Sequence, residues 1–145
     1  MKLIPAIDLM NGKCVRLFKG DFNKRKDFSR EPYEQAKYWE NEGAKCIHIV
    51  DLDAAKTGIP KNDQSIQKII KSVNIPIQIG GGIRSLERIE QLFSYGVDKV
   101  IMGTSAIENK ELVKSLSTKF PRKIIIGIDA KDGNCLLYTS DAADE

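Results

Sequence analysis

The sequence predicts an α/β fold, the first four and a half βα units of a (β/α)8 TIM barrel, from two observations. Short apolar runs alternate with amphipathic stretches along the 145 residues, as strands and helices do in a parallel sheet with right-handed crossovers. The chain also repeats itself. The segments Lys2–Gly12 and Lys123–Gly133 each contain an apolar run that ends in Ile-Asp, with glycine four residues after the aspartate. Twice the 121-residue offset between them is close to the roughly 250 residues of a complete barrel, which predicts two equivalent half-barrels.

Five apolar runs have the length and composition of strands that are buried on both faces. The first and the last belong to the repeat, so we expect them at equivalent places in the two half-barrels. The expected strands are Leu3–Ile7, Cys46–Val50, Ile75–Ile79, Val100–Met102 and Ile124–Ile128.

Four stretches between these runs carry apolar residues at helical spacing and predict helices. In the third, Ser85 suits the N-cap and Gly96 suits the C-terminal stop. The expected helices are Glu31–Glu42, Ser65–Ser72, Ser85–Tyr95 and Lys110–Lys119. An open doubly wound sheet would show the same alternation. The repeat favours the barrel, as does the placement of polar residues after successive strands instead of at one switch point.

Composition and charge narrow the function classes. With 41% hydrophobic and 30% charged residues and a net charge of +3, the chain is typical of a globular protein. Its longest apolar runs, of about five residues, are far too short to span a membrane. A charged residue and a strand directly follow Met1, which leaves no room for a signal sequence and predicts a cytoplasmic protein. The basic run Asn23–Lys26 has no interleaved aromatic residues, so we expect no nucleic-acid partner.

Asp8 and Asp129 are the first candidates for catalysis. A single aspartate after a strand usually caps a turn or a helix. Here the same residue recurs at the equivalent place in both copies of the repeat. Two half-barrels would hold these carboxylates across one mouth, as an acid–base pair requires.

Two glycine-containing turns are candidates for binding phosphate. Gly80–Ser85 follows the third expected strand, and Gly103–Ser105 follows the fourth. Glycine lets the backbone approach a phosphate closely, and the helix that follows offers free N–H groups. Such turns are also common for purely steric reasons.

Four further polar residues each allow two interpretations. His48 lies inside the second expected strand, where it is either a packed polar residue or part of a site. Asp51 and Asp53 end that strand and either orient a substrate hydroxyl or cap a turn. Arg16 is either a bidentate phosphate ligand or an ordinary surface arginine.

Taken together, these motifs resemble the ProFAR isomerases of histidine biosynthesis. Those aldose–ketose isomerases act on phosphoribosylformimino-aminoimidazole carboxamide ribotide. The resemblance covers residues 1–134 and implies a TIM barrel with an internal two-fold repeat. The matching stretches are Ile4–Leu9, Arg16–Phe22, Ile47–Lys56, Gly80–Ser85 and Val100–Ala106.

The resemblance also implies site residues and chemistry. It makes Asp8 the proton acceptor and Asp129 the proton donor of an Amadori rearrangement that requires no metal and no organic cofactor. The substrate is a small phosphoribosyl compound, and the full-length parent is expected to be a monomer. Residues assigned to the phosphate site are Gly81, Gly82, Arg84, Thr104 and Ser105, and those assigned to the substrate cleft are Arg16 and His48.

Three alternatives stay open beside this one. The cyclase subunit of imidazole glycerol phosphate synthase shares the repeat and both aspartates, but this chain departs from it at Ala6–Leu9 and Met102–Thr104. A non-catalytic, phosphate-binding half-barrel that works as a homodimer is the second. The third is an isomerase that also accepts phosphoribosylanthranilate.

The last eleven residues, 135–145, resemble a translated sequencing adapter and not a protein segment. We therefore expect residues 1–134 to be the N-terminal part of the barrel domain and residues 135–145 to be a non-native tail. This 145-residue piece is itself expected to be inactive, because the remaining βα units are absent from it.

Overall fold

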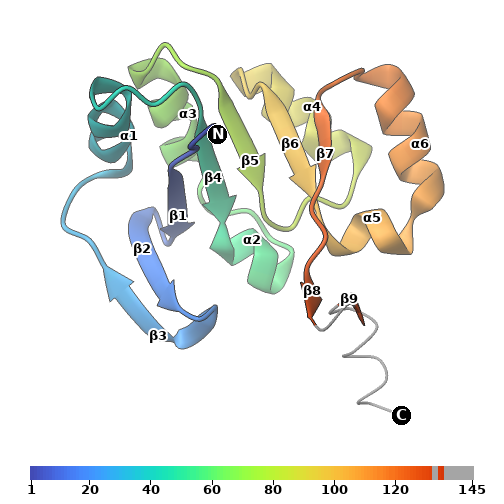
Figure 1. Ribbon diagram of the computed structural model, residues 1–145, viewed down its shortest axis with the longest axis horizontal. Coiled ribbons are helices and arrows are strands. Elements are labelled where there is room, and N and C mark those ends of the chain that lie inside the picture. Colours follow the sequence, from blue (N-terminus) through green and yellow to red (C-terminus); the bar gives the residue numbers. More distant parts are fainter. Residues whose placement is uncertain (132–133, 136–145) are drawn as a thin grey trace.

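The computed structural model describes residues 1–131 and 134–135, which form one seven-stranded sheet with helices against it (Figure 1). Five strands are parallel, namely β1 (Ala6–Met10), β4 (Ile47–Asp51), β5 (Ile77–Gly80), β6 (Lys99–Met102) and β7 (Ile124–Ile126). The sheet order is β3-β2-β1-β4-β5-β6-β7, and within the described residues the sheet is open, with β3 and β7 at its edges.

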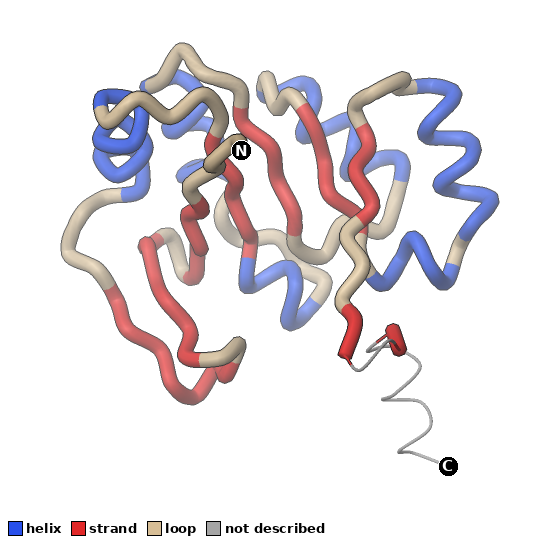
Figure 2. The backbone as a smooth tube through the Cα atoms, viewed as in Figure 1, coloured by secondary structure: helices blue, strands red, loops and turns tan. Residues whose placement is uncertain are grey.

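A β-hairpin extends the sheet beyond β1. Its strands, β2 (Lys13–Phe18) and β3 (Asp21–Asp27), are antiparallel to their neighbours. A separate two-stranded ribbon, β8 (Ala130–Lys131) with β9 (Asn134–Cys135), follows β7. The helices are α1 (Pro32–Asn41), α2 (Leu52–Thr57), α3 (Asp63–Ser72), α4 (Leu86–Tyr95), α5 (Thr104–Glu108) and α6 (Lys110–Lys119) (Figure 2). Apart from Cys135, the predicted tail lies outside the described residues.

The strand register carries the stagger of a TIM barrel. Followed across the sheet from Asp8, the paired residues end at Ile125 on β7, four residues before Asp129. A TIM barrel accumulates a shear of about eight residues around eight strands, and therefore about four over the four steps from β1 to β7. The repeat and the register thus agree that Asp8 and Asp129 are equivalent positions. The row is Asp8, Val50, Gly80, Ile101 and Ile125.

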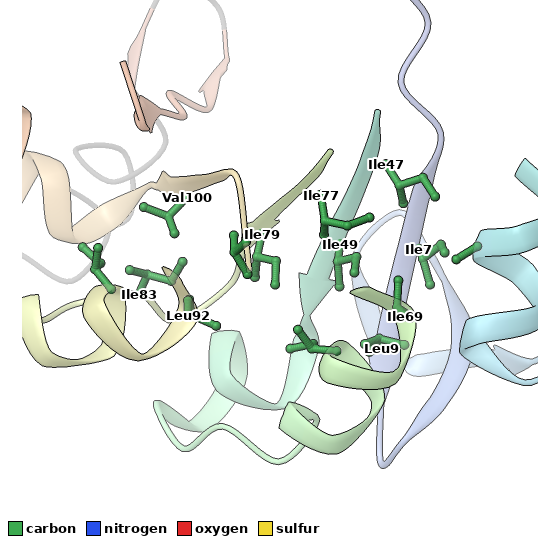
Figure 3. Close-up of a cluster of buried hydrophobic side chains, with 14 of the residues drawn as sticks. Ile7, Leu9, Ile47, Ile49, Ile69, Ile77, Ile79, Ile83, Leu92 and Val100 are labelled. Atoms are coloured by element: carbon green, nitrogen blue, oxygen red, sulfur yellow. The ribbon is translucent and has the colours of Figure 1, made fainter. Parts of the chain in front are cut away.

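Alternate residues of each parallel strand face the helices and form the core. Ile7 and Leu9 of β1, with Ile47 and Ile49 of β4, are at most 2% exposed. They pack with buried residues of α3 and α4 in one cluster (Figure 3). Because side chains alternate along a strand, residues of the Asp8 row lie on the opposite face of the sheet. We call this side the open face.

The four expected helices are confirmed as α1, α3, α4 and α6. The caps of α4 are those expected from the sequence. The Ser85 hydroxyl accepts a hydrogen bond from Arg88 N at 3.2 Å, and Gly96 ends the helix in the left-handed conformation with φ 103°. No helix within the described part of the chain combines the length and apolar character needed to cross a membrane.

The expected bounds of the first strand are wrong. β1 starts at Ala6, and Leu3 and Ile4 before it are 75% and 38% exposed. The strand runs on to Met10 because the Asn11–Gly12 turn folds the chain back and gives β1 a second partner in β2. At the other end of the sheet, β7 stops at Ile126, and Ile128 is 68% exposed.

The hairpin and the two shortest helices were not predicted from the sequence. Most residues of β3 are exposed and charged, so this strand has no apolar alternation. The Asn-Gly pair at 11–12 is nevertheless a strong hairpin signal. Helices α2 and α5, of six and five residues, are too short to show a helical period.

Candidate functional site

A cavity of about 440 Å³ opens on the open face at the carboxyl ends of β4, β5 and β6. It brings together residues from three βα connections and from the segment after β7, as parallel strands with aligned carboxyl ends allow. Seven of the nine residues predicted for the site line it: His48, Gly81, Gly82, Arg84, Thr104, Ser105 and Asp129.

Gly81 and Gly82 have a steric reason for being glycine. A Cβ on Gly81 would lie 2.3 Å from the carbonyl oxygen of Asp51, and one on Gly82 would lie 2.2 Å from that of Ala54. Both residues also have positive φ, of 107° and 64°. The turn after β5 therefore packs directly on the turn after β4, and this contact requires glycine whether or not a phosphate binds.

Ser105 joins two of the loops around the cavity. Its buried hydroxyl donates a 2.6 Å hydrogen bond to the carbonyl of Ile83, which ties α5 to the turn after β5. Thr104, the exposed first residue of α5, lines the same cavity. The first backbone N–H groups of a helix have no acceptor within the helix, so this end of α5 offers donors to an anion.

His48 reaches the cavity from β4 and is oriented by a neighbour on β5. Gln78 Nε2 lies 3.3 Å from His48 Nδ1. If the amide donates, Nδ1 is the acceptor and the ring proton lies on Nε2. Burial lowers the pKa of His48, against the smaller opposing effect of Asp8. A neutral imidazole with a fixed tautomer can exchange hydrogen bonds with a sugar hydroxyl.

Asp8 lies on the open face at the level of Val50 and Gly80, but it lines a different cavity. This second cavity, of about 450 Å³, lies between β1, β2 and α1 and also receives Arg16 and Trp39. Asp8 pairs directly with Val15, so the next residue of β2, the exposed Arg16, leaves the sheet on the other face. The described chain therefore does not unite Asp8 and Arg16 with the other seven residues.

The environment of Asp8 changes its acidity. Burial raises the pKa of this carboxyl, and His48 opposes the rise through its charge. A carboxylate with a raised pKa is a stronger base, which suits proton abstraction. Asp129 is exposed and follows β7, which lies four strand positions from β1 in the sheet.

Asp51 and Asp53 cap turns, which decides between the two interpretations of these residues. Asp51 Oδ1 accepts from Ala54 N at 3.0 Å and so caps α2. Asp53 Oδ2 accepts from Asn11 N at 2.8 Å and from Asn62 Nδ2 at 2.9 Å.

Sequence reasoning missed two polar residues here. Gln78 orients His48, and Asn62 joins both aspartates. The position of Gln78 on the His48 face of a paired strand could have indicated it, whereas Asn62 lies in a polar loop with no distinguishing signal. Within residues 1–131 and 134–135, no three His, Cys, Asp or Glu side chains gather as a metal site would require.

Comparison with known proteins places the chain in a family. Residues 2–144 match the family model described as histidine biosynthesis protein. A Prochlorococcus marinus subsp. pastoris protein from strain MED4 is 95% identical over 133 residues. Those from strains MIT 9515 and NATL2A are 92% and 57% identical over the same length. All three are named 1-(5-phosphoribosyl)-5-((5-phosphoribosylamino)methylideneamino) imidazole-4-carboxamide isomerase. The matched residues are 92% of this chain but 52% of each relative, so the chain spans about half their length.

Proposed function

The chain belongs to the histidine biosynthesis protein family, and on this premise we propose that the whole protein is a ProFAR isomerase. It would convert the aminoaldose to the corresponding aminoketose. The observation that carries the proposal is the pair of equivalent aspartates. Asp8 and Asp129 occupy matching places in the repeat, and the four-residue stagger between their strands is that of half a TIM barrel.

The proposed chemistry divides between the two carboxyls. Asp129, as the acid, gives a proton to the ribose ring oxygen, the ring C–O bond breaks, and the nitrogen lone pair forms a C=N bond. Asp8, as the base, then takes the proton from C2. The electrons of that C–H bond form the C1=C2 bond of the enolamine, and the C=N electrons return to nitrogen. The enolamine then gains a proton at C1 while the hydroxyl on C2 loses one, which gives the ketose. The raised pKa of Asp8 supports its assignment as the base. The protonated imine is itself the electron sink, so the scheme uses no metal and no cofactor.

A substrate phosphate would bind in the 440 Å³ cavity. Arg84 supplies a positive charge there, and α5 presents backbone N–H groups beside Thr104. Phosphate bound at this place would leave the sugar to extend across the open face towards His48 and Asp8. We further infer that the whole protein is cytoplasmic and monomeric and that its partner is this small phosphorylated sugar.

A rate assay tests the proposal on a full-length protein. We define the hybrid as residues 1–131 of this chain followed by the rest of the MED4 relative. With ProFAR as substrate, we expect turnover within the usual enzyme range of about 1–10³ s⁻¹. Asp129→Asn should lower it by about 10²–10⁴-fold, the usual contribution of one positioned acid.

Two further assays test whether the protein accepts a second substrate and whether the half-barrel is active alone. Phosphoribosylanthranilate in the same assay tests for a second substrate. The unjoined 145-residue chain should show no turnover, because half of a barrel cannot hold the sugar between the two carboxyls. A hybrid without turnover, or one in which Asp129→Asn is fully active, would refute the proposed function.

A further inference from the structure

Two side chains from outside these strands, Asp53 and Asn62, bind the turn between β1 and β2. Both turn residues are left-handed, with φ 49° at Asn11 and 75° at Gly12. The N–H of Asn11 donates to Asp53 Oδ2, and the N–H of Gly12 donates to Asn62 Oδ1, both at 2.8 Å. The two acceptors lie more than forty residues away in sequence, so these bonds fix the hairpin against the rest of the sheet.

Asn62 is the centre of this network. Its amide nitrogen donates to Asp51 Oδ1 at 2.7 Å and to Asp53 Oδ2 at 2.9 Å, while its oxygen accepts from Gly12. Asn62 and Asp51 are each 1% exposed, and Asp53 is 8% exposed. One buried amide therefore joins the β1–β2 turn, the end of β4 and the start of α3. Burying these polar groups would be unfavourable without the bonds.

The network fixes the segment that carries Asp8. Asp8 is three residues before Asn11, and its neighbour Leu9 pairs with Asp51, the last residue of β4. Asp51 is in turn bonded to Asn62, and Asn62 to the turn. Strand pairing and side-chain hydrogen bonds together therefore fix the end of β1. Rotation of the hairpin would move Asp8 with it.

Building on the proposed isomerase function, we propose that Asn62 is a positioning residue. Through Asp53 and the β1–β2 turn, it holds Asp8 in the place from which that carboxylate removes a proton from the substrate. Asn62 does not line the cavity of the phosphate-binding turns, so its effect on the reaction is indirect.

The neighbouring residue, Asp63, provides a matched control. Asp63 is the first residue of α3 and, like Asn62, is bonded to side chains of another element. It receives two bonds from Arg88, at 2.7 and 2.8 Å, and one from Tyr95 at 3.1 Å, all from α4. This cluster joins α3 to α4 and does not reach the hairpin. Asp63→Asn should therefore lower the melting temperature, because it weakens hydrogen bonds to a charged group, without moving Asp8.

The test compares Asn62→Ala with Asp63→Asn in the hybrid, well below the melting temperature of either. For Asn62→Ala, we expect kcat to fall by about 10²-fold, which a misplacement of roughly 1 Å can cause, with KM little changed. Asp63→Asn should keep both constants despite its lower stability. If Asn62→Ala does not fold, Asp53→Ala replaces it. This variant frees the Asn11 N–H and removes one of the two buried carboxylates, and it should lower kcat in the same way.

The outcomes separate the inference from the proposed function. Unchanged kcat in Asn62→Ala, or in Asp53→Ala where that replaces it, would overturn the positioning role alone. So would equal losses of kcat in Asn62→Ala and Asp63→Asn. No turnover in the unsubstituted hybrid would overturn the proposed function and, with it, any catalytic effect of Asn62.

Discussion

The two ends of the sheet, the strands β4 to β6 on one side and β1 with the hairpin on the other, build their parts of the candidate site in different ways. At the ends of β4, β5 and β6, consecutive loops pack on one another, and the cavity follows from backbone contacts such as that of Gly82 with Ala54. Beyond β1, the β2–β3 hairpin carries the exposed Arg16, and Asn62 and Asp53 bind the β1–β2 turn that leads into it. One side is positioned by close backbone packing, and the other by hydrogen bonds to the β1–β2 turn together with a small apolar cluster around Met10, Val15 and Leu52.

This contrast explains why the loops around the cavity contain small residues and the hairpin contains charged ones. Close packing needs small residues, and it leaves little freedom in the loops that would bind phosphate. The hairpin is instead rich in charge, and Phe18 at its end is 58% exposed beneath the ammonium groups of Lys19 and Lys24. Strand β3, most of whose residues are exposed, has few buried apolar contacts, and such a segment is the part of a fold that opens most easily.

Among the substitutions that test this contrast, Gly82→Ala should have the largest effect on the free energy of unfolding. Its Cβ would overlap the carbonyl of Ala54 at 2.2 Å in a left-handed conformation, φ 64°. We expect a loss of about 3 kcal/mol or more in the free energy of unfolding, from backbone strain and overpacking together. Chemical denaturation of the hybrid measures it.

Gly20→Ala is the matched control on the hairpin side. Gly20 has a similar φ, 76°, but nothing lies within 4 Å of the position of its Cβ. Only the backbone cost of roughly 1–2 kcal/mol should remain. Equal losses in the two variants would show that the contact after β4 does not constrain the turn after β5.

A smaller effect, of opposite sign, is expected from Asp8→Asn. Because burial raises the pKa of Asp8, the folded protein binds this proton more tightly than the unfolded chain, so the ionised carboxylate lowers stability at neutral pH. Asparagine removes that cost, and the melting temperature at pH 7 should rise. The difference between the two proteins should vanish as the pH falls below the ordinary aspartate value of about 3.9. A melting temperature that falls at pH 7 would contradict the burial of this carboxylate.

The sequence predicted one side of the molecule better than the other, for physical reasons. The parallel strands and the four longer helices have strong apolar patterns, because one face of each helix and the helix-facing side of each parallel strand are buried in the core. Strand β3 has no such pattern, since most of its residues are exposed. Its existence depends on the Asn-Gly turn and on pairing with β2, which composition does not reveal.

The candidate site, too, could be predicted from the sequence only in part. Motifs at strand ends identified the loops around the cavity, yet they could not show that Gly81 and Gly82 are required by contacts to Asp51 and Ala54. Nor could they show that the Ser105 hydroxyl is already bonded to Ile83. Asn62 escaped notice because its importance depends on bonds to residues nine, eleven and fifty positions away.

We propose a division between the two sides, in which the cavity side binds phosphate and β1 supplies the base. The most direct test measures kcat and KM for Asp8→Asn and Thr104→Ala in the hybrid. Asp8→Asn should lower kcat by about 10²–10⁴-fold with KM nearly unchanged, whereas Thr104→Ala should raise KM and leave kcat close to that of the unsubstituted hybrid. An Asp8→Asn variant with normal kcat, or a Thr104→Ala variant that loses kcat but keeps KM, would contradict it.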